Sequence, residues 1–131
     1  MQKSLQIESD PENLRIVENL IDRLSEEHKI EAGLYGKILV ATVEAVNNAI
    51  IHGNKYDRNK KIDIWISTEM EKVKICIRDE GEGFEYDNVP DPTAPENIEN
   101  IHGRGIFLMK KLCDNIEFRN NGAEVELTFK L

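Results

Sequence analysis

Apolar side chains at every second position constrain this chain more than any other feature of its sequence. Two neighbouring segments carry the pattern, in the alternate residues Ile62, Ile64, Ile66, Val73, Ile75 and Ile77. Successive side chains of a β-strand point to opposite faces, so each segment has one apolar and one polar face. A short turn at residues 69–71 joins the two segments, which predicts a β-hairpin in a sheet that is covered on one side.

The remaining segments extend this architecture. Alternation predicts further strands at residues 5–7, 116–118 and 125–131. Apolar residues at helical spacing predict three helices, which end near residue 28 and span residues 35–51 and 105–113. A chain of 131 residues has the length of one domain. We therefore expect residues 1–131 to form a single α+β domain, a two-layer sandwich whose mixed, mostly antiparallel sheet is covered on one face by helices.

Charge and cysteine content exclude several functions. The formal net charge is −8 and the pI is about 4.9, which argues against a nucleic-acid-binding protein. Cys76 and Cys113 form no CxxC pair, so neither a zinc site nor a redox pair is predicted. We expect no signal peptide at the start of the chain and no apolar stretch as long as a membrane span. We therefore expect a cytoplasmic protein that contacts neither membrane nor nucleic acid directly.

The helix predicted over residues 35–51 carries an unexpected polar pair. Leu39, Val43 and other apolar residues cover most of its sides, which predicts a buried helix. Glu44 and Asn48 are four residues apart and share one face, next to Asn47. On a surface helix these residues would be a solvated stripe, but a buried carboxylate needs a partner. An amide oxygen can bind Mg²⁺, and a carboxylate beside it can deprotonate a hydroxyl.

An acid with two spaced glycines follows the predicted strand over residues 73–78. Asp79, Gly81 and Gly83 could form an ordinary polar turn. In a functional interpretation, the ionised acid accepts a hydrogen bond from an exocyclic amine. The glycines would let the backbone approach a flat ring closely.

A second pair of glycines precedes the predicted helix over residues 105–113. Gly103, Arg104 and Gly105 could be a simple helix-start turn. Free backbone N–H groups at a helix start also attract phosphate, and Arg104 could add a bidentate contact. The P-loop pattern GxxxxGK[ST] and the protein-kinase motifs HRD and DFG are absent from the sequence.

These motifs, taken in their order, resemble the ATPase superfamily of gyrase, the heat-shock chaperone, histidine kinases and mismatch-repair proteins, known as the GHKL or Bergerat fold. Within it, the chain is most similar to small bacterial anti-sigma factors that are also serine kinases. The resemblance rests on three segments, Glu44 to Gly53, Asp79 to Phe84 and Gly103 to Met109.

The resemblance implies a role for each residue of the helix motif. Glu44 would be the general base, Asn48 would bind Mg²⁺, and Asn47 would line the phosphates of ATP.

The glycine motifs would hold the rest of the nucleotide. Asp79 would accept a hydrogen bond from the adenine amine, and Gly81 and Gly83 would let the ring approach. The phosphates would lie under a lid at residues 85–104, held by Gly103, Arg104 and Gly105.

The resemblance also implies an activity and partners. The chain would be an ATP-dependent serine-protein kinase (a transferase) and anti-sigma factor in transcription regulation, with ATP and Mg²⁺ as cofactors. It would phosphorylate a STAS-type anti-anti-sigma partner, sequester a sigma factor and form a homodimer.

One departure from the family leaves an alternative open. The family often has Gly-Thr where this chain has Gly122-Ala123, and Thr128 lies too far along to replace that threonine. One lost hydrogen bond is worth about 0.5–1.5 kcal/mol, or up to roughly tenfold in ATP affinity. The alternative is an ATP- or ADP-responsive binding switch with little kinase activity.

A detached ATP-binding domain of a histidine kinase is a third hypothesis. It is weakened because the segment before Leu14 offers no helical hairpin for a phosphoacceptor histidine.

Overall fold

The computed structural model describes residues 2–82 and 101–131, and of residues 101–103 it describes the backbone alone. Strands and long helices follow the order β1 (Gln2–Glu8), α1 (Leu14–His28), α2 (Ala32–Asn48), β2 (Lys61–Glu69), β3 (Lys72–Arg78), α3 (Ile101–Leu112), β4 (Asn115–Arg119) and β5 (Glu124–Lys130). Each predicted strand is present, and the predicted hairpin is the β2–β3 pair.

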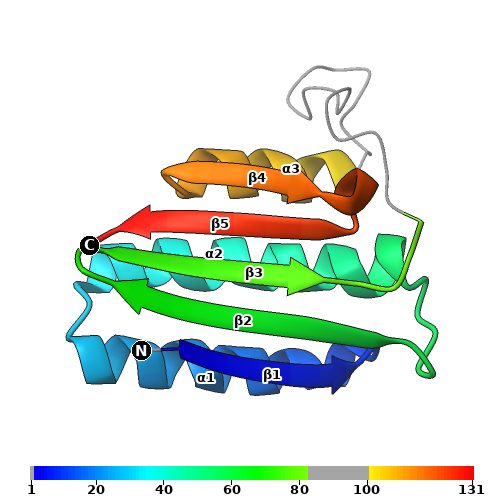
Figure 1. The fold of residues 1–131 in the computed structure, drawn as a ribbon, viewed down its shortest axis with the longest axis horizontal. Helices are drawn as coiled ribbons and strands as arrows, with labels where there is room; N and C mark the ends of the chain where they lie inside the picture. The colour runs from blue at the N-terminus through cyan, green and yellow to red at the C-terminus, as the bar shows by residue number, and fades with distance from the viewer. Residues whose placement is uncertain (1, 83–100) are drawn as a thin grey trace.

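The five strands form one sheet in the order β1-β2-β3-β5-β4. All four of the described pairings are antiparallel. Figure 1 shows the three helices lying side by side behind this sheet, and no helix among residues 2–82 and 101–131 covers its other, open face. The predicted two-layer α+β sandwich is therefore confirmed.

The core lies between the sheet and the helices. The alternating residues of the hairpin face it, and Ile62, Ile64, Ile66, Val73, Ile75 and Ile77 are each at most 1% exposed. Complete burial of one such side chain contributes about 1.5–3 kcal/mol relative to exposure. On the open face, Trp65 is 39% exposed and the Arg78 guanidinium lies 5.4 Å from the centre of its ring.

Helix α2 is the central helix of the helical layer and packs against α1 and α3 (Figure 1). Its inner face is buried as predicted, but Val40 is 42% exposed, so one side reaches solvent. Residues Ala32–Gly53 are long and apolar enough to cross a membrane by length and composition alone. The prediction that no apolar stretch reaches that length is thus wrong, although the core helix of a globular domain passes the same test.

The end of α2 differs from the predicted boundary. Regular α-helix ends at Asn48, and residues Ala49–Gly53 continue as a wider π-helical turn. The backbone N–H of Asn54 donates to the Ala49 carbonyl at 2.8 Å and closes this turn. Wide turns of this kind occur often at functional sites.

Helix α3 begins four residues earlier than predicted. It starts at Ile101, so Gly103, Arg104 and Gly105 lie inside its first two turns and not before it. Glycine is a poor helix former, so the sequence placed Gly103 before the helix and predicted the start of α3 too late. Packing of α3 against α2 outweighs this local preference, because a helix is stabilised mainly by its tertiary contacts.

Candidate functional site

The helix motif and the acid turn meet in one narrow pocket at the C-terminal ends of α2 and β3. The lining residues come from α2 and its π-helical turn, β3, α3, β4 and β5, and are Ala45, Asn48, Ala49, His52, Gly53, Ile77, Asp79, Met109, Phe118, Gly122, Ala123 and Val125. Its free volume is about 30 Å³, well below the 300–1,000 Å³ typical of ligand pockets. A flat ring can therefore enter only if the walls move apart.

The acid turn is anchored by its own backbone. The Asp79 N–H donates to the Ala123 carbonyl at 2.9 Å, and the Gly81 N–H donates to Asp79 Oδ1 at 2.7 Å. Burial raises the pKa of the Asp79 carboxyl, while the Gly81 hydrogen bond and the charge of Lys60 oppose the rise. A carboxylate has about four acceptor positions, so Asp79 can accept a further hydrogen bond from a ligand amine.

Two glycines allow the end of α2 to touch this turn. A Cβ on Gly53 would lie 2.3 Å from Asp79 Cγ and Oδ2, and a Cβ on Gly81 would lie 2.3 Å from the Gly53 carbonyl oxygen. The absence of a side chain at Gly81 lets the backbone of Gly53 approach, and the approach of a ring to Gly81 stays a prediction. The contact of Gly53 with Asp79 was missed, because nothing in the sequence relates the two positions. Gly83 lies outside the described residues.

Glu44 and Asn48 lie together on α2, directly against α3. Both are half-buried, and a Cβ on Gly105 would lie 3.1 Å from Asn48 Oδ1 and from Glu44 Oε2. Thus the structure brings these three predicted residues together. Burial raises the pKa of the Glu44 carboxyl, which disfavours its charged form.

The Asn48 amide provides a test of whether this site suits a metal-bound phosphate. Its buried Nδ2 has no hydrogen-bond partner in the part of the chain that the structure describes. The nitrogen and the oxygen of a side-chain amide are nearly indistinguishable in position. What the structure establishes is therefore a buried amide group that lacks a hydrogen-bond partner and lies next to a carboxylate. Buried polar groups normally have partners, so these residues fit a bound Mg²⁺ and phosphate. No group of three or more metal-ligating acids, histidines or cysteines occurs within residues 2–82 and 101–131.

Other predicted site residues do not line the pocket. Asn47 is half-buried on α2, and Arg104 is exposed on the first turn of α3. Neither is among the residues that line the pocket. Gly103 has helical backbone in α3. Most of the predicted lid, residues 85–100, lies outside the described residues.

Ala123 occupies the position where the family often has threonine. It lines the pocket and is 7% exposed, and its carbonyl accepts the Asp79 N–H. Thr128 pairs with Lys74 and Asn115 farther along β5 and does not line the pocket. The pocket wall at residue 123 is therefore a methyl group and a carbonyl, without a hydroxyl.

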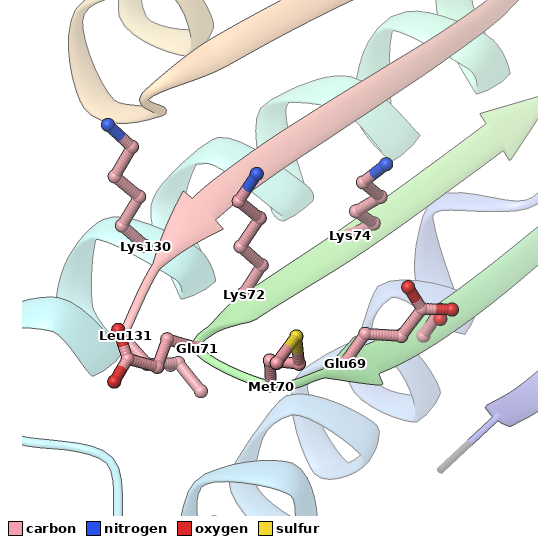
Figure 2. Close-up of a pocket in the computed structure, with 8 residues that line it drawn as sticks. Glu69, Met70, Glu71, Lys72, Lys74, Lys130 and Leu131 are labelled. Atoms are coloured by element: carbon pink, nitrogen blue, oxygen red, sulfur yellow. The ribbon is translucent and has the colours of Figure 1, made fainter.

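A wider hollow of about 990 Å³ lies at the opposite end of β3, beside the β2–β3 turn. Figure 2 shows Lys72, Lys74 and Lys130 extending from neighbouring strands there, with Met70 at the turn. This hollow contains none of the predicted site residues. We therefore place the candidate site at the other end of β3, where the motifs meet, although that pocket is smaller.

Comparison with known proteins gives one family and a group of relatives. Residues 7–129 match the histidine kinase-like ATPase domain family. The chain is similar to serine-protein kinase RsbW of Staphylococcus aureus strains JH9, Newman and JH1, with 32% identity over 97 residues in each case. The match covers 68% of this chain and 61% of each relative, so the chain spans about three-fifths of the relatives' length.

The contact between Gly53 and Asp79 yields a prediction. Replacement Gly53→Ala should lower ATP affinity at least about tenfold, because the new methyl group must displace the carboxylate that faces the pocket. Isothermal titration calorimetry measures the change.

Gly36→Ala is the matched control in the same helix, since a Cβ there meets nothing within 4 Å. It should leave ATP affinity unchanged and raise the free energy of unfolding by about 0.5–1 kcal/mol. Equal ATP affinity in the two variants would show that close contact at Gly53 is not needed for binding.

Proposed function

The chain belongs to the histidine kinase-like ATPase family, and from this we propose that residues 1–131 act as a single ATP-binding domain that transfers phosphate from ATP to a serine of a partner protein. The observation that carries the proposal is the unsatisfied Asn48 amide beside the half-buried Glu44 carboxylate, at the same end of the sheet as the Asp79 turn. In a helix with a purely structural role, removing such groups from water without a partner would only cost free energy.

The adenine half of the proposed site is the Asp79 turn. We propose that Asp79 accepts a hydrogen bond from the exocyclic amine of adenine. The hydrogen bond from the Gly81 N–H orients the carboxylate for this contact, and Ile77, Met109 and Val125 supply apolar walls for the ring. The role proposed for Gly83 rests on the resemblance alone.

The phosphate half of the proposed site lies between α2 and α3. Asn48 would hold Mg²⁺ through its amide oxygen, and Asn47, Gly103, Arg104 and Gly105 would hold phosphates. Bound Mg²⁺ would neutralise charge on the phosphates during transfer. The small Gly105 leaves the Asn48 and Glu44 side chains within reach of a group placed between the helices.

Glu44 is the proposed general base. In the transfer, the serine oxygen bonds to the γ-phosphorus of ATP, the bond from that phosphorus to the β–γ bridging oxygen breaks, and ADP leaves. Glu44 accepts the proton of the serine hydroxyl. Burial raises its pKa towards the working pH, which makes it a stronger base than an exposed glutamate while the pH remains above that pKa.

The proposed partners follow from the resemblance and from the name of the relatives. RsbW of Staphylococcus aureus is a serine-protein kinase. We propose that this chain phosphorylates a serine of a STAS-type anti-anti-sigma protein, sequesters a sigma factor, forms a homodimer and acts in the cytoplasm in transcription regulation. The alternative is an ATP- or ADP-responsive switch with little kinase activity, which the missing hydroxyl at Ala123 favours.

The role of Asn48 can be tested through its dependence on magnesium. Asn48→Ala should weaken binding of Mg²⁺-ATP at least about tenfold and binding of metal-free ATP much less, since the amide oxygen is a proposed metal ligand. Calorimetry with magnesium and with a chelator measures both affinities.

Asn47→Ala serves as the comparison: as a proposed phosphate contact and not a metal ligand, Asn47 should contribute equally to the affinity for Mg²⁺-ATP and for metal-free ATP. Equal losses of ATP affinity in Asn48→Ala with and without magnesium would show that Asn48 packs in the helix and does not bind the metal.

The role of Glu44 can be tested through the chemical step. Glu44→Gln should bind ATP nearly normally but transfer phosphate about 10²–10⁴-fold more slowly, the usual contribution of a positioned general base. Rates of phosphoserine formation at saturating ATP measure this loss.

The proposed role of Glu44 also predicts how the rate of phosphate transfer depends on pH. The base must be ionised, so the wild-type rate should fall as the pH is lowered through a pKa above the ordinary glutamate value of 4.5. Glu44→Gln should lack this acidic decline. Wild-type transfer rates in Glu44→Gln would refute the proposed mechanism.

A further inference from the structure

Asn54 is a buried asparagine whose side chain connects three distant segments. It is 1% exposed and follows the π-helical turn directly. Its Nδ2 donates to Ser9 Oγ at 2.8 Å and to the Lys61 carbonyl at 3.0 Å, and its Oδ1 accepts the Glu80 N–H at 2.8 Å. Both donor positions and one acceptor position are therefore used.

These contacts are not those of an ordinary turn asparagine. Asparagine in a turn usually bonds to its own backbone two residues away. The partners of Asn54 are instead 45, 7 and 26 residues away along the chain. A buried polar network with satisfied groups favours a single arrangement of its members, and here the members include the turn that forms the pocket.

The Asp79–Gly81 turn depends on this network for one of its three anchors. Its three successive N–H groups each have a different acceptor: Ala123 for Asp79, Asn54 for Glu80, and the Asp79 carboxylate for Gly81. The Glu80 carboxylate additionally accepts the Lys61 N–H. Asn54 is thus the side chain that ties the middle of the turn to the end of α2, next to the tight Gly53 contact.

We propose that Asn54 is a positioning residue for recognition of the nucleotide base. It holds the Glu80 N–H, and thereby fixes where the carboxylate of Asp79 faces the pocket, without touching the nucleotide itself. This inference rests on the proposed function, namely that ATP binds with its adenine at Asp79.

The test compares ATP with inosine triphosphate (ITP), which carries oxygen in place of the adenine amine. Calorimetric affinities of both nucleotides are measured for wild type, Asn54→Ala and Ser9→Ala. The ratio of ATP to ITP affinity should fall at least about fivefold in Asn54→Ala, because a displaced carboxylate loses its preference for the amine. Partial unfolding alone would lower the number of binding sites and leave this ratio unchanged.

Ser9→Ala is the matched control, since Ser9 is equally buried and bonds to Asn54 but forms no hydrogen bond with residues 79–81 in the described part of the chain. It should keep the ratio within about twofold of wild type. The inference would be overturned if Asn54→Ala kept the wild-type ratio of ATP to ITP affinity, or if this ratio fell equally in Asn54→Ala and Ser9→Ala. Failure of the wild-type protein to bind ATP would instead overturn the proposed function.

A measurement on the wild-type protein covers the case in which Asn54→Ala does not fold. Glu80 is an exposed residue, yet its N–H is bonded to a buried side chain. Its amide hydrogen should therefore exchange slowly in the nucleotide-free protein. Exchange as fast as that of an unstructured amide would contradict the anchoring role of Asn54.

Discussion

The contact between the end of α2 and the end of β3 is the constraint on which the rest of the site depends. At this point the backbone of Gly53 touches both the carboxylate of Asp79 and the backbone of Gly81, at distances that leave no room for a side chain. Helix α2 carries Glu44 and Asn48, and β3 leads into Asp79. The contact therefore sets how far the proposed catalytic face lies from the proposed adenine-reading acid.

Burial of polar groups at this site has an energetic cost. The pKa values of Glu44 and Asp79 are both raised by burial, so the folded chain disfavours their ionised forms. The sign follows from linkage: each group lowers stability as the pH rises from its unfolded to its folded pKa, and this cost is absent at lower pH. The Asn48 amide adds a second cost, since it lacks a hydrogen-bond partner among the described residues. Such costs are typical of sites that bind a charged ligand.

Local patterns predicted the architecture well and the site contacts less completely. Alternation located each strand because it follows directly from which face of the sheet is buried. The start of α3 was misplaced because packing against α2 outweighed the low helix propensity of its glycines. The roles of Gly53 and Asn54 were missed because Asp79, which Gly53 contacts, and Glu80, whose N–H Asn54 accepts, each lie 26 residues further along the chain, and no local pattern encodes such contacts.

Phosphate transfer by the wild-type protein tests the central claim most directly. The chain is incubated with Mg²⁺-ATP and a STAS-type anti-anti-sigma protein from the same organism, and the products are analysed by mass spectrometry. Phosphoserine on the partner, formed together with an equal amount of ADP, is the result that the proposed base Glu44 beside Asn48 predicts. Tight ATP binding without phosphoserine would contradict the kinase and support the nucleotide-responsive binding switch.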